Sequence, residues 1–199
     1  MTNPKIDSIL DEANRLFLKG RLHDAVSYYD KILVEVPNHL SSLNNKGYAL
    51  SKLKDYDGAM KCYDDALEIE PNDLSVLVNR ISILRKQGNY GDALYFCDKI
   101  LENNPKYNIV LYHKERILFF MKKFEESIVC CDKILSDYPH NSDVLFDKAC
   151  NLAMFSKTEE CLQTLQQAIL QDNDLKIKAK KSQLFEKLKD NPNFQKMLL

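Results

Sequence analysis

Apolar and small residues recur at helical spacing in successive blocks along the chain. In one block Leu43, Gly47 and Leu50 stand three or four residues apart, and the next block opens with Ala59 and Tyr63. This spacing places the side chains on one face of an α-helix. The pattern therefore predicts pairs of amphipathic helices joined by short turns.

Four prolines repeat at an interval of 34 residues, and they are Pro37, Pro71, Pro105 and Pro139. Proline cannot continue a helix, so each one marks the end of a second helix. The interval divides residues 1–175 into five repeats, which are 6–39, 40–73, 74–107, 108–141 and 142–175. One helix pair cannot bury its apolar stripe alone, and the repeats are therefore expected to stack on one another.

Turn and cap residues fit the same division. Gly20 and Gly88 lie between the two helices of their repeats, where a tight turn favours glycine. Asn72-Asp73 and Asn141-Ser142 follow two of the prolines, and their side-chain oxygens can accept a hydrogen bond from the first turn of the next helix. We therefore expect helices to begin at these two residue pairs.

A 34-residue helix-turn-helix unit that ends in proline resembles the tetratricopeptide repeat family. The repeat 40–73 matches the family pattern best, through Gly47, Ala59, Tyr63, Ala66 and Pro71. The resemblance implies an all-α, right-handed superhelical solenoid whose first helices line the concave side and whose second helices form the outside. Glu115 departs from the pattern, because it stands where the family packs a small residue. Since burying a lone charge is costly, we expect Glu115 to reach Ser127, a nearby cation or solvent.

The segment 176–199 differs from the repeats in charge. It contains seven Lys and has a net charge of +5, whereas residues 1–175 have a net charge of −6. A stripe of Ile177, Leu184 and Leu188 predicts a basic capping helix over the last repeat. Asn191-Pro192 predicts the start of a short terminal helix.

Composition narrows the classes of function. With 45% hydrophobic and 29% charged residues, the chain has the composition of a folded protein. A formal net charge of −1 argues against a nucleic-acid or membrane-surface partner held by an overall basic field. The N-terminus has neither signal-peptide nor transit-peptide character, so we expect a cytoplasmic protein. The six cysteines are then expected to be reduced and to pack as small apolar residues.

The sequence contains no catalytic or metal-binding pattern. Its four histidines fall at non-equivalent positions of the repeats, and no two of them have the spacing of three or four residues that a metal site on one helix needs. A Gly-rich phosphate loop and a nucleophile elbow are also missing. We therefore expect a protein that is not an enzyme and has no cofactor or metal.

The resemblance implies that the concave side binds the ligand. The side chains expected to form this peptide-binding groove are Asn14, Asn45, Tyr48, Asn79, Arg85, Lys86, Tyr112, His113, Arg116, Phe120 and Phe146. Asparagine amides can pair with an extended peptide backbone, cations favour an acidic peptide, and the aromatic residues offer an anchor point. We expect that replacing the three asparagines weakens binding and leaves thermal unfolding nearly unchanged.

Two of these residues, Asn14 and Asn45, match positions with which co-chaperone-like members of the family hold a C-terminal carboxylate. The cationic positions of that clamp are Leu10, Ser75 and Asn79 in this chain, so the clamp is incomplete. The leading hypothesis is an adaptor or scaffold, monomeric or weakly homo-oligomeric, that binds an extended peptide or partner helix without catalysis. The alternative is a self-associating scaffold that uses the C-terminal helix or the end repeats.

Overall fold

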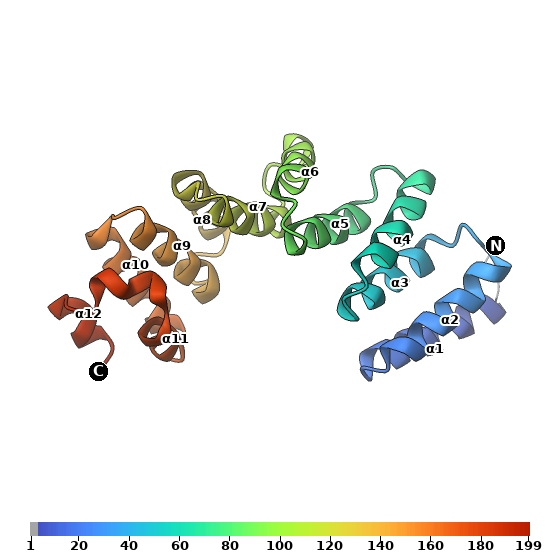
Figure 1. Ribbon diagram of the computed structural model, residues 1–199, viewed down its shortest axis with the longest axis horizontal. Helices are drawn as coiled ribbons and strands as arrows, with labels where there is room; N and C mark the ends of the chain where they lie inside the picture. Colours follow the sequence, from blue (N-terminus) through green and yellow to red (C-terminus); the bar gives the residue numbers. More distant parts are fainter. Residues whose placement is uncertain (1–3) are drawn as a thin grey trace. The chain divides into compact units, whose positions relative to one another are not determined.

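A computed structural model describes residues 4–199, and within this range the chain is folded into helices joined by short turns (Figure 1). This confirms the predicted all-α class. Five consecutive helix pairs are followed by a C-terminal segment that contains a short 3-10 helix, η1. The bounds are α1 Pro4–Leu18, α2 Leu22–Glu35, α3 Leu40–Lys52, α4 Tyr56–Ile69, α5 Leu74–Lys86, α6 Tyr90–Asn103, α7 Asn108–Phe120, α8 Phe124–Asp137, α9 Ser142–Met154, α10 Thr158–Gln171, α11 Leu175–Lys181, η1 Gln183–Leu188 and α12 Pro192–Met197.

Each helix pair turns at a residue with a positive φ angle, between 60° and 77°, and these residues are Gly20, Lys54, Gly88, Lys122 and Ser156. The next residue bonds back across the end of the first helix, as where the Asp55 N–H donates to the Leu50 carbonyl at 3.0 Å. The turns predicted at Gly20 and Gly88 are thus confirmed. The other three were missed because lysine and serine give no sequence signal for a left-handed turn.

Helix starts are capped by side chains. Asp73 Oδ1 accepts from the Val76 N–H at 2.8 Å, and Asn141 Oδ1 accepts from the Val144 N–H at 3.1 Å. The sequence predicted a cap within Asn72-Asp73 and within Asn141-Ser142, and the structure shows that Asp73 and Asn141 are the caps. These bonds satisfy backbone donors that the first turn of a helix leaves without a partner.

The chain divides into two compact units, which contain the described residues 4–96 and 97–199. In the first unit α2 packs on α1 and α3, and α4 packs on α3 and α5. In the second unit α8 packs on α7 and α9, and α9 packs on α10. The second helices α2, α4 and α8 therefore each bridge two first helices, which is how neighbouring pairs share one core.

Buried residues show why the pairs fit together. Tyr29 and Tyr63 are fully enclosed in the first unit. Gly47 allows the close approach of Tyr63, because a Cβ at Gly47 would lie 2.5 Å from Tyr63 Cε1. All six cysteines are buried and free, which confirms that they pack as small apolar residues. None of the helices within residues 4–199 combines the length and the apolar character that a membrane crossing requires.

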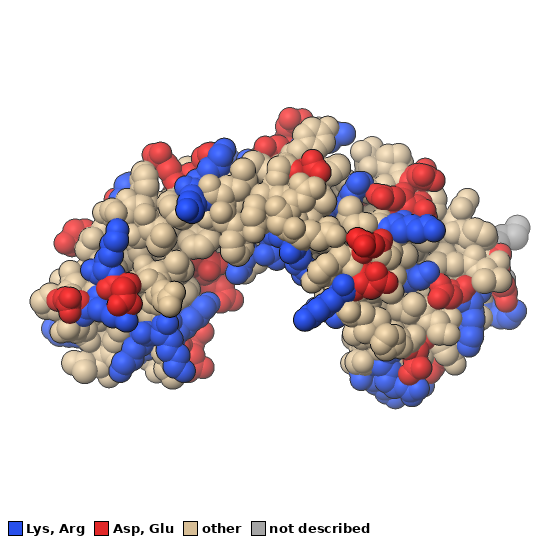
Figure 2. Space-filling model, in the orientation of Figure 1, with Lys and Arg blue, Asp and Glu red and all other residues tan. Residues whose placement is uncertain are grey.

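The C-terminal segment differs from the predicted capping helix. The backbone is extended at Ser182, so α11 ends there and the helical spacing does not continue to Leu184. Ile177, expected to be buried, is 57% exposed, whereas Phe185 and Phe194 are enclosed in the core formed with α9 and α10. Asn191 caps α12 as predicted. Basic side chains gather over the C-terminal elements in Figure 2, in line with the predicted charge of this segment.

Candidate functional site

The first helices of neighbouring pairs contact each other directly. In the first unit α3 touches both α1 and α5. We call the surface of α1, α3 and α5 the first-helix face of the first unit. It is where the structure places six of the predicted site residues, namely Asn14, Asn45, Tyr48, Asn79, Arg85 and Lys86.

The asparagines on this face bond to other side chains of the chain. Asn45 Nδ2 donates to Asn14 Oδ1 at 3.0 Å, and the Tyr29 hydroxyl donates to the same oxygen at 2.7 Å. Asn79 Nδ2 donates to Asn44 Oδ1 at 2.9 Å. These bonds join α1 to α3 and α3 to α5, and each is worth about 1 kcal/mol in net stability. The expectation that replacing the asparagines leaves unfolding unchanged is therefore wrong, because the amides hold neighbouring helices together.

Three cations, Lys52, Arg85 and Lys86, lie at the C-terminal ends of α3 and α5, and we call them the cationic cluster. Lys86 Nζ donates to Ser51 Oγ at 3.2 Å, and Lys52 Nζ lies 5.2 Å from the centre of the Tyr48 ring. Burial, with repulsion from Lys52 and Arg85, lowers the pKa of Lys86. Within residues 4–199 neither Lys52 nor Lys86 forms an ion pair with a carboxylate. The cluster is therefore suited to an anionic group.

The remaining predicted residues lie in the second unit, on α7 and α9. Next to them is a cavity of about 230 Å³, which we call the acid pocket. Its walls are formed by α7, α9 and the C-terminal segment, through Glu115, Arg116, Phe119, Phe120, Phe146, Asp147, Cys150, Lys178, Ser182 and Leu184. Three predicted residues, Arg116, Phe120 and Phe146, line it, whereas Tyr112 and His113 stand beside it on α7.

The aromatic residues of the pocket differ in exposure. Phe120 is 51% exposed, but Phe146 is only 3% exposed and packs edge to face against Phe185, with ring centres 5.7 Å apart. Phe146 is thus a core residue that also lines the pocket. The sequence pattern missed this double role because the residue it packs on belongs to η1, outside the repeats.

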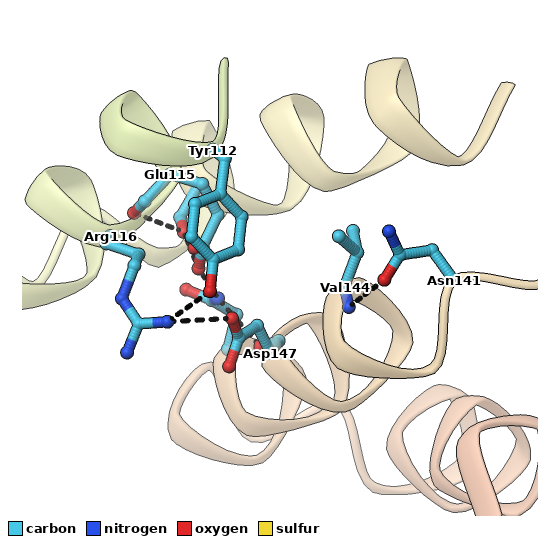
Figure 3. A network of polar contacts seen from close by, with 8 residues as sticks. Tyr112, Glu115, Arg116, Asn141, Val144 and Asp147 are labelled. Carbon is cyan, nitrogen blue, oxygen red and sulfur yellow. Dashed lines mark hydrogen bonds and ion pairs between the residues drawn. The ribbon is translucent and has the colours of Figure 1, made fainter. Parts of the chain in front are cut away.

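Glu115 lies in the buried part of the pocket and is 2% exposed (Figure 3). Its Oε1 atom accepts hydrogen bonds from Ser127 Oγ at 3.2 Å and from Asn151 Nδ2 at 3.0 Å. The predicted contact with Ser127 is therefore confirmed. Burial and the nearby carboxylate of Asp147 raise the pKa of Glu115 to about 7. Its Oε2 atom has no hydrogen-bond partner among the described residues.

Arg116 joins the polar groups at the pocket wall (Figure 3). Its Nη1 atom donates to the Tyr112 hydroxyl at 2.6 Å and lies 3.4 Å from Asp147 Oδ2. Burial raises the pKa of Asp147 even though Arg116 and Lys178 act to lower it. The inner wall thus presents two carboxyl groups whose charged forms are disfavoured by burial.

Sequence reasoning missed a set of ion pairs between neighbouring helix pairs. A cation on each first helix from α3 onward meets an aspartate on the preceding second helix, at distances of 2.5 to 3.2 Å. The pairs are Lys46–Asp30, Arg80–Asp64, Lys114–Asp98 and Lys148–Asp132. Both partners recur at the 34-residue interval, so aligning the charged positions of the repeats would have found them.

Comparison with known proteins agrees with this architecture. The model of the tetratricopeptide repeat family matches residues 41–73. The structure of a tetratricopeptide repeat protein from Parabacteroides merdae ATCC 43184 aligns with a TM-score of 0.83 and 18% identity, over 98% of this chain and 78% of that one. Residues 41–73 thus match a tetratricopeptide repeat, and the chain has the fold of tetratricopeptide repeat proteins.

Other solved structures share this tetratricopeptide repeat fold. One is PilW, described as a widely conserved type IV pilus biogenesis factor, with a TM-score of 0.83 and 15% identity over 98% of this chain and 91% of that one. Another is YrrB, described as having an unusual peptide-binding site, with a TM-score of 0.70 and 20% identity over 87% of this chain and 91% of that one. No curated protein sequence matches the chain.

Proposed function

We propose that this tetratricopeptide repeat protein is an adaptor or scaffold that binds an extended peptide or helix of another protein on its first helices, without catalysis. The observation that carries the proposal is the cationic cluster on the first-helix face of the first unit. Three cations converge there, beside the half-exposed Tyr48 ring, and repulsion among them contributes to the lowered pKa of Lys86. A bound carboxylate would relieve that repulsion.

The proposed partner is therefore a peptide segment with acidic residues. The asparagines of the first-helix face keep part of their capacity for such a segment. Asn45 and Asn79 each use one amide proton in the bonds to α1 and α3, which leaves their Oδ1 atoms and second protons for a peptide backbone. YrrB, which is described as having a peptide-binding site, is a precedent for peptide binding by this fold. Its similarity to this chain extends only to the fold.

The self-association alternative has two forms, in which either the C-terminal helix or an end repeat docks on a second molecule, and the structure bears on the first of them. In the structure this helix, α12, packs on α10 of its own chain, and its Phe194 is 2% exposed. Phe194 is thus already used within the chain, and we propose that the segment 176–199 closes the last repeat.

The proposal is tested with peptides selected by phage display against the full chain. We expect the selected sequences to be rich in Asp and Glu. We also expect Lys52→Ala and Lys86→Ala each to weaken their binding by roughly five- to tenfold, or about 1 kcal/mol, measured by fluorescence anisotropy.

Lys61→Ala is the matched control, because Lys61 is an exposed lysine of the same unit that lies on a second helix, α4. Its substitution is expected to leave the affinity unchanged. Selection of peptides without acidic residues, or equal losses for the Lys52, Lys86 and Lys61 variants, would contradict the proposed site.

A further inference from the structure

A residue that lines the acid pocket, Glu115, has a buried acceptor atom that lacks a donor. This atom is Oε2, which has no hydrogen-bond partner among the described residues, and a second such atom, Asn151 Oδ1, lies on a residue that bonds to Glu115 but does not line the pocket. Both residues belong to the network that also includes Ser127, and Asn151 is fully buried. Buried acceptors are almost always paired, so the pocket is suited to a guest that brings a hydrogen-bond donor.

The charges around the pocket show which kind of donor fits. Glu115 and Asp147 contribute two carboxyl groups, and Arg116 contributes one cation at 3.4 Å from Asp147. The second cation, Lys178, lies on the exposed side of α11 and forms no ion pair with a carboxylate within residues 4–199. If Lys178 leaves the pocket and both carboxyl groups are ionised, Glu115, Asp147 and Arg116 together have a net charge of −1, and one further cation would neutralise it and favour the ionised carboxylates.

The position of the Lys178 ammonium group shows where a cation can lie in the acid pocket. Its Nζ atom lies 4.3 Å from the centre of the Phe146 ring, within the range of a cation–π contact. The side chain is exposed, so it can leave this position without breaking a buried contact. Lys178 therefore occupies the aromatic side of the pocket in the way an incoming ammonium group would.

Size and wall chemistry restrict the guest further. A cavity of about 230 Å³ is smaller than the pockets that hold whole drug-sized ligands, so it suits one side chain of a larger ligand. Phe119 and Phe120 form an aromatic wall, with their rings edge to face and their centres 6.0 Å apart. An aliphatic stem can lie against such a wall while its charged end reaches the acid groups.

We propose that the acid pocket takes the basic side chain of a bound peptide, lysine or arginine. The guest cation bonds to Glu115, its stem lies against Phe119 and Phe120, and it displaces Lys178 from the Phe146 ring. This inference rests on the proposed function, because it takes the ligand to be a segment of another protein. The second unit is thus proposed to bind a basic side chain of the ligand, and the first unit is proposed to bind its acidic residues.

The test uses short capped peptides that differ at one central position, which is lysine, arginine, norleucine, acetyl-lysine or glutamate. Norleucine and acetyl-lysine keep an apolar stem and lack the cation. Each peptide is titrated into the full chain, and binding is followed by NMR shifts of the backbone amides. We expect the lysine and arginine peptides to shift the amides around Phe119, Cys150 and Leu184, and to bind at least about fivefold more tightly than the neutral peptides.

Two substitutions separate the parts of the proposal. Lys178→Ala removes the competing cation and is expected to tighten binding of the lysine peptide by roughly three- to tenfold. Lys180→Ala on the same helix is the control, because Lys180 is exposed and does not line the pocket.

Glu115→Gln is expected to abolish the preference for lysine over norleucine. Its control is Glu125→Gln, at an exposed position on α8, which is expected to keep that preference.

Three results would overturn the proposal. The first is equal binding of the lysine and norleucine peptides, and the second is tighter binding of the glutamate peptide. The third is a Lys178→Ala variant that binds the lysine peptide more weakly than the wild type. If any of these occurs while display-selected peptides still bind the first unit, the proposed function stands and the basic anchor is wrong. If display also selects no peptide, the proposed function fails as well.

Discussion

Glu115 shows how one residue can change the chemistry of a repeat. The equivalent residues of the other repeats are Ala13, Gly47, Ile81 and Ala149. Cys131 occupies the position that Tyr63 has in the second repeat, and this smaller side chain lies close enough to Glu115 for the carboxylate to act on the pKa of its thiol. The exchange converts an apolar helix contact into a buried acid held by Ser127 and Asn151.

This buried acid makes the stability of the second unit depend on pH. The pKa of Glu115 is about 7 in the folded chain, whereas the ordinary pKa of a glutamate side chain is 4.5. The folded state therefore binds more protons between these values, and stability falls as the pH rises through that window. The full shift corresponds to a loss of about 3 kcal/mol above pH 8. Asp147, whose pKa is also raised by burial, acts in the same direction.

Glu115→Gln should remove most of this dependence, because glutamine keeps the shape of the side chain and does not ionise. We expect urea unfolding to show a smaller difference in the free energy of unfolding between pH 5 and pH 8 for the variant than for the wild type. Asp147 is present in both proteins, so the comparison isolates Glu115. Parallel pH profiles would show that Glu115 is not the group responsible.

At the scale of helices, the repeated ion pairs connect each second helix to the first helix of the next pair. The cations are about three-quarters buried, with side-chain exposures of 23% to 25%, and the aspartates are about half exposed. The bond to Asp30 keeps the pKa of Lys46 above its usual value although burial acts to lower it. The ion pair thus offsets the cost of burying the lysine, and its position fixes the register of neighbouring helices.

A double-mutant cycle on Lys148 and Asp132 measures this contribution. We expect a coupling energy of about 0.5 to 1 kcal/mol, since half-exposed ion pairs contribute modestly. A second cycle that combines Lys148→Ala with Glu159→Ala, at an exposed position on α10, is expected to give a coupling near zero. Coupling energies that are the same in both cycles would mean that the repeated pairs do not hold the helices in register.

At the scale of the whole molecule, most of the fold was predictable because local signals repeat. The prolines, the turn glycines and the caps at Asp73 and Asn141 each act within one helix end, so the sequence shows them directly. The repeat boundaries stay a prediction, and they are 6–39, 40–73, 74–107, 108–141 and 142–175. Fragments that are cut between the observed helices can test them.

The candidate site was less predictable because it depends on contacts between distant parts of the chain. Arg116, Phe120 and Phe146 were found from their position on first helices. Lys178 and Leu184 were not, because they belong to the C-terminal segment outside the repeats, where Lys178 lies on α11 and Leu184 follows the end of α11 at Ser182. The prediction for Ile177 failed because α11 buries Leu175 and Ala179 and ends at Ser182, so Ile177 does not share a helix face with Leu184 and Leu188.

The central proposal is that the first helices bind a segment of another protein. The most direct measurement of this is paramagnetic relaxation of the chain's amide NMR signals by a spin-labelled peptide from the display selection. We predict signal loss on first helices, above all at Tyr48, Lys52 and Lys86 on α3 and α5. Signal loss confined to the second helices α2, α4, α8 and α10, or spread evenly over the chain, would contradict the proposal.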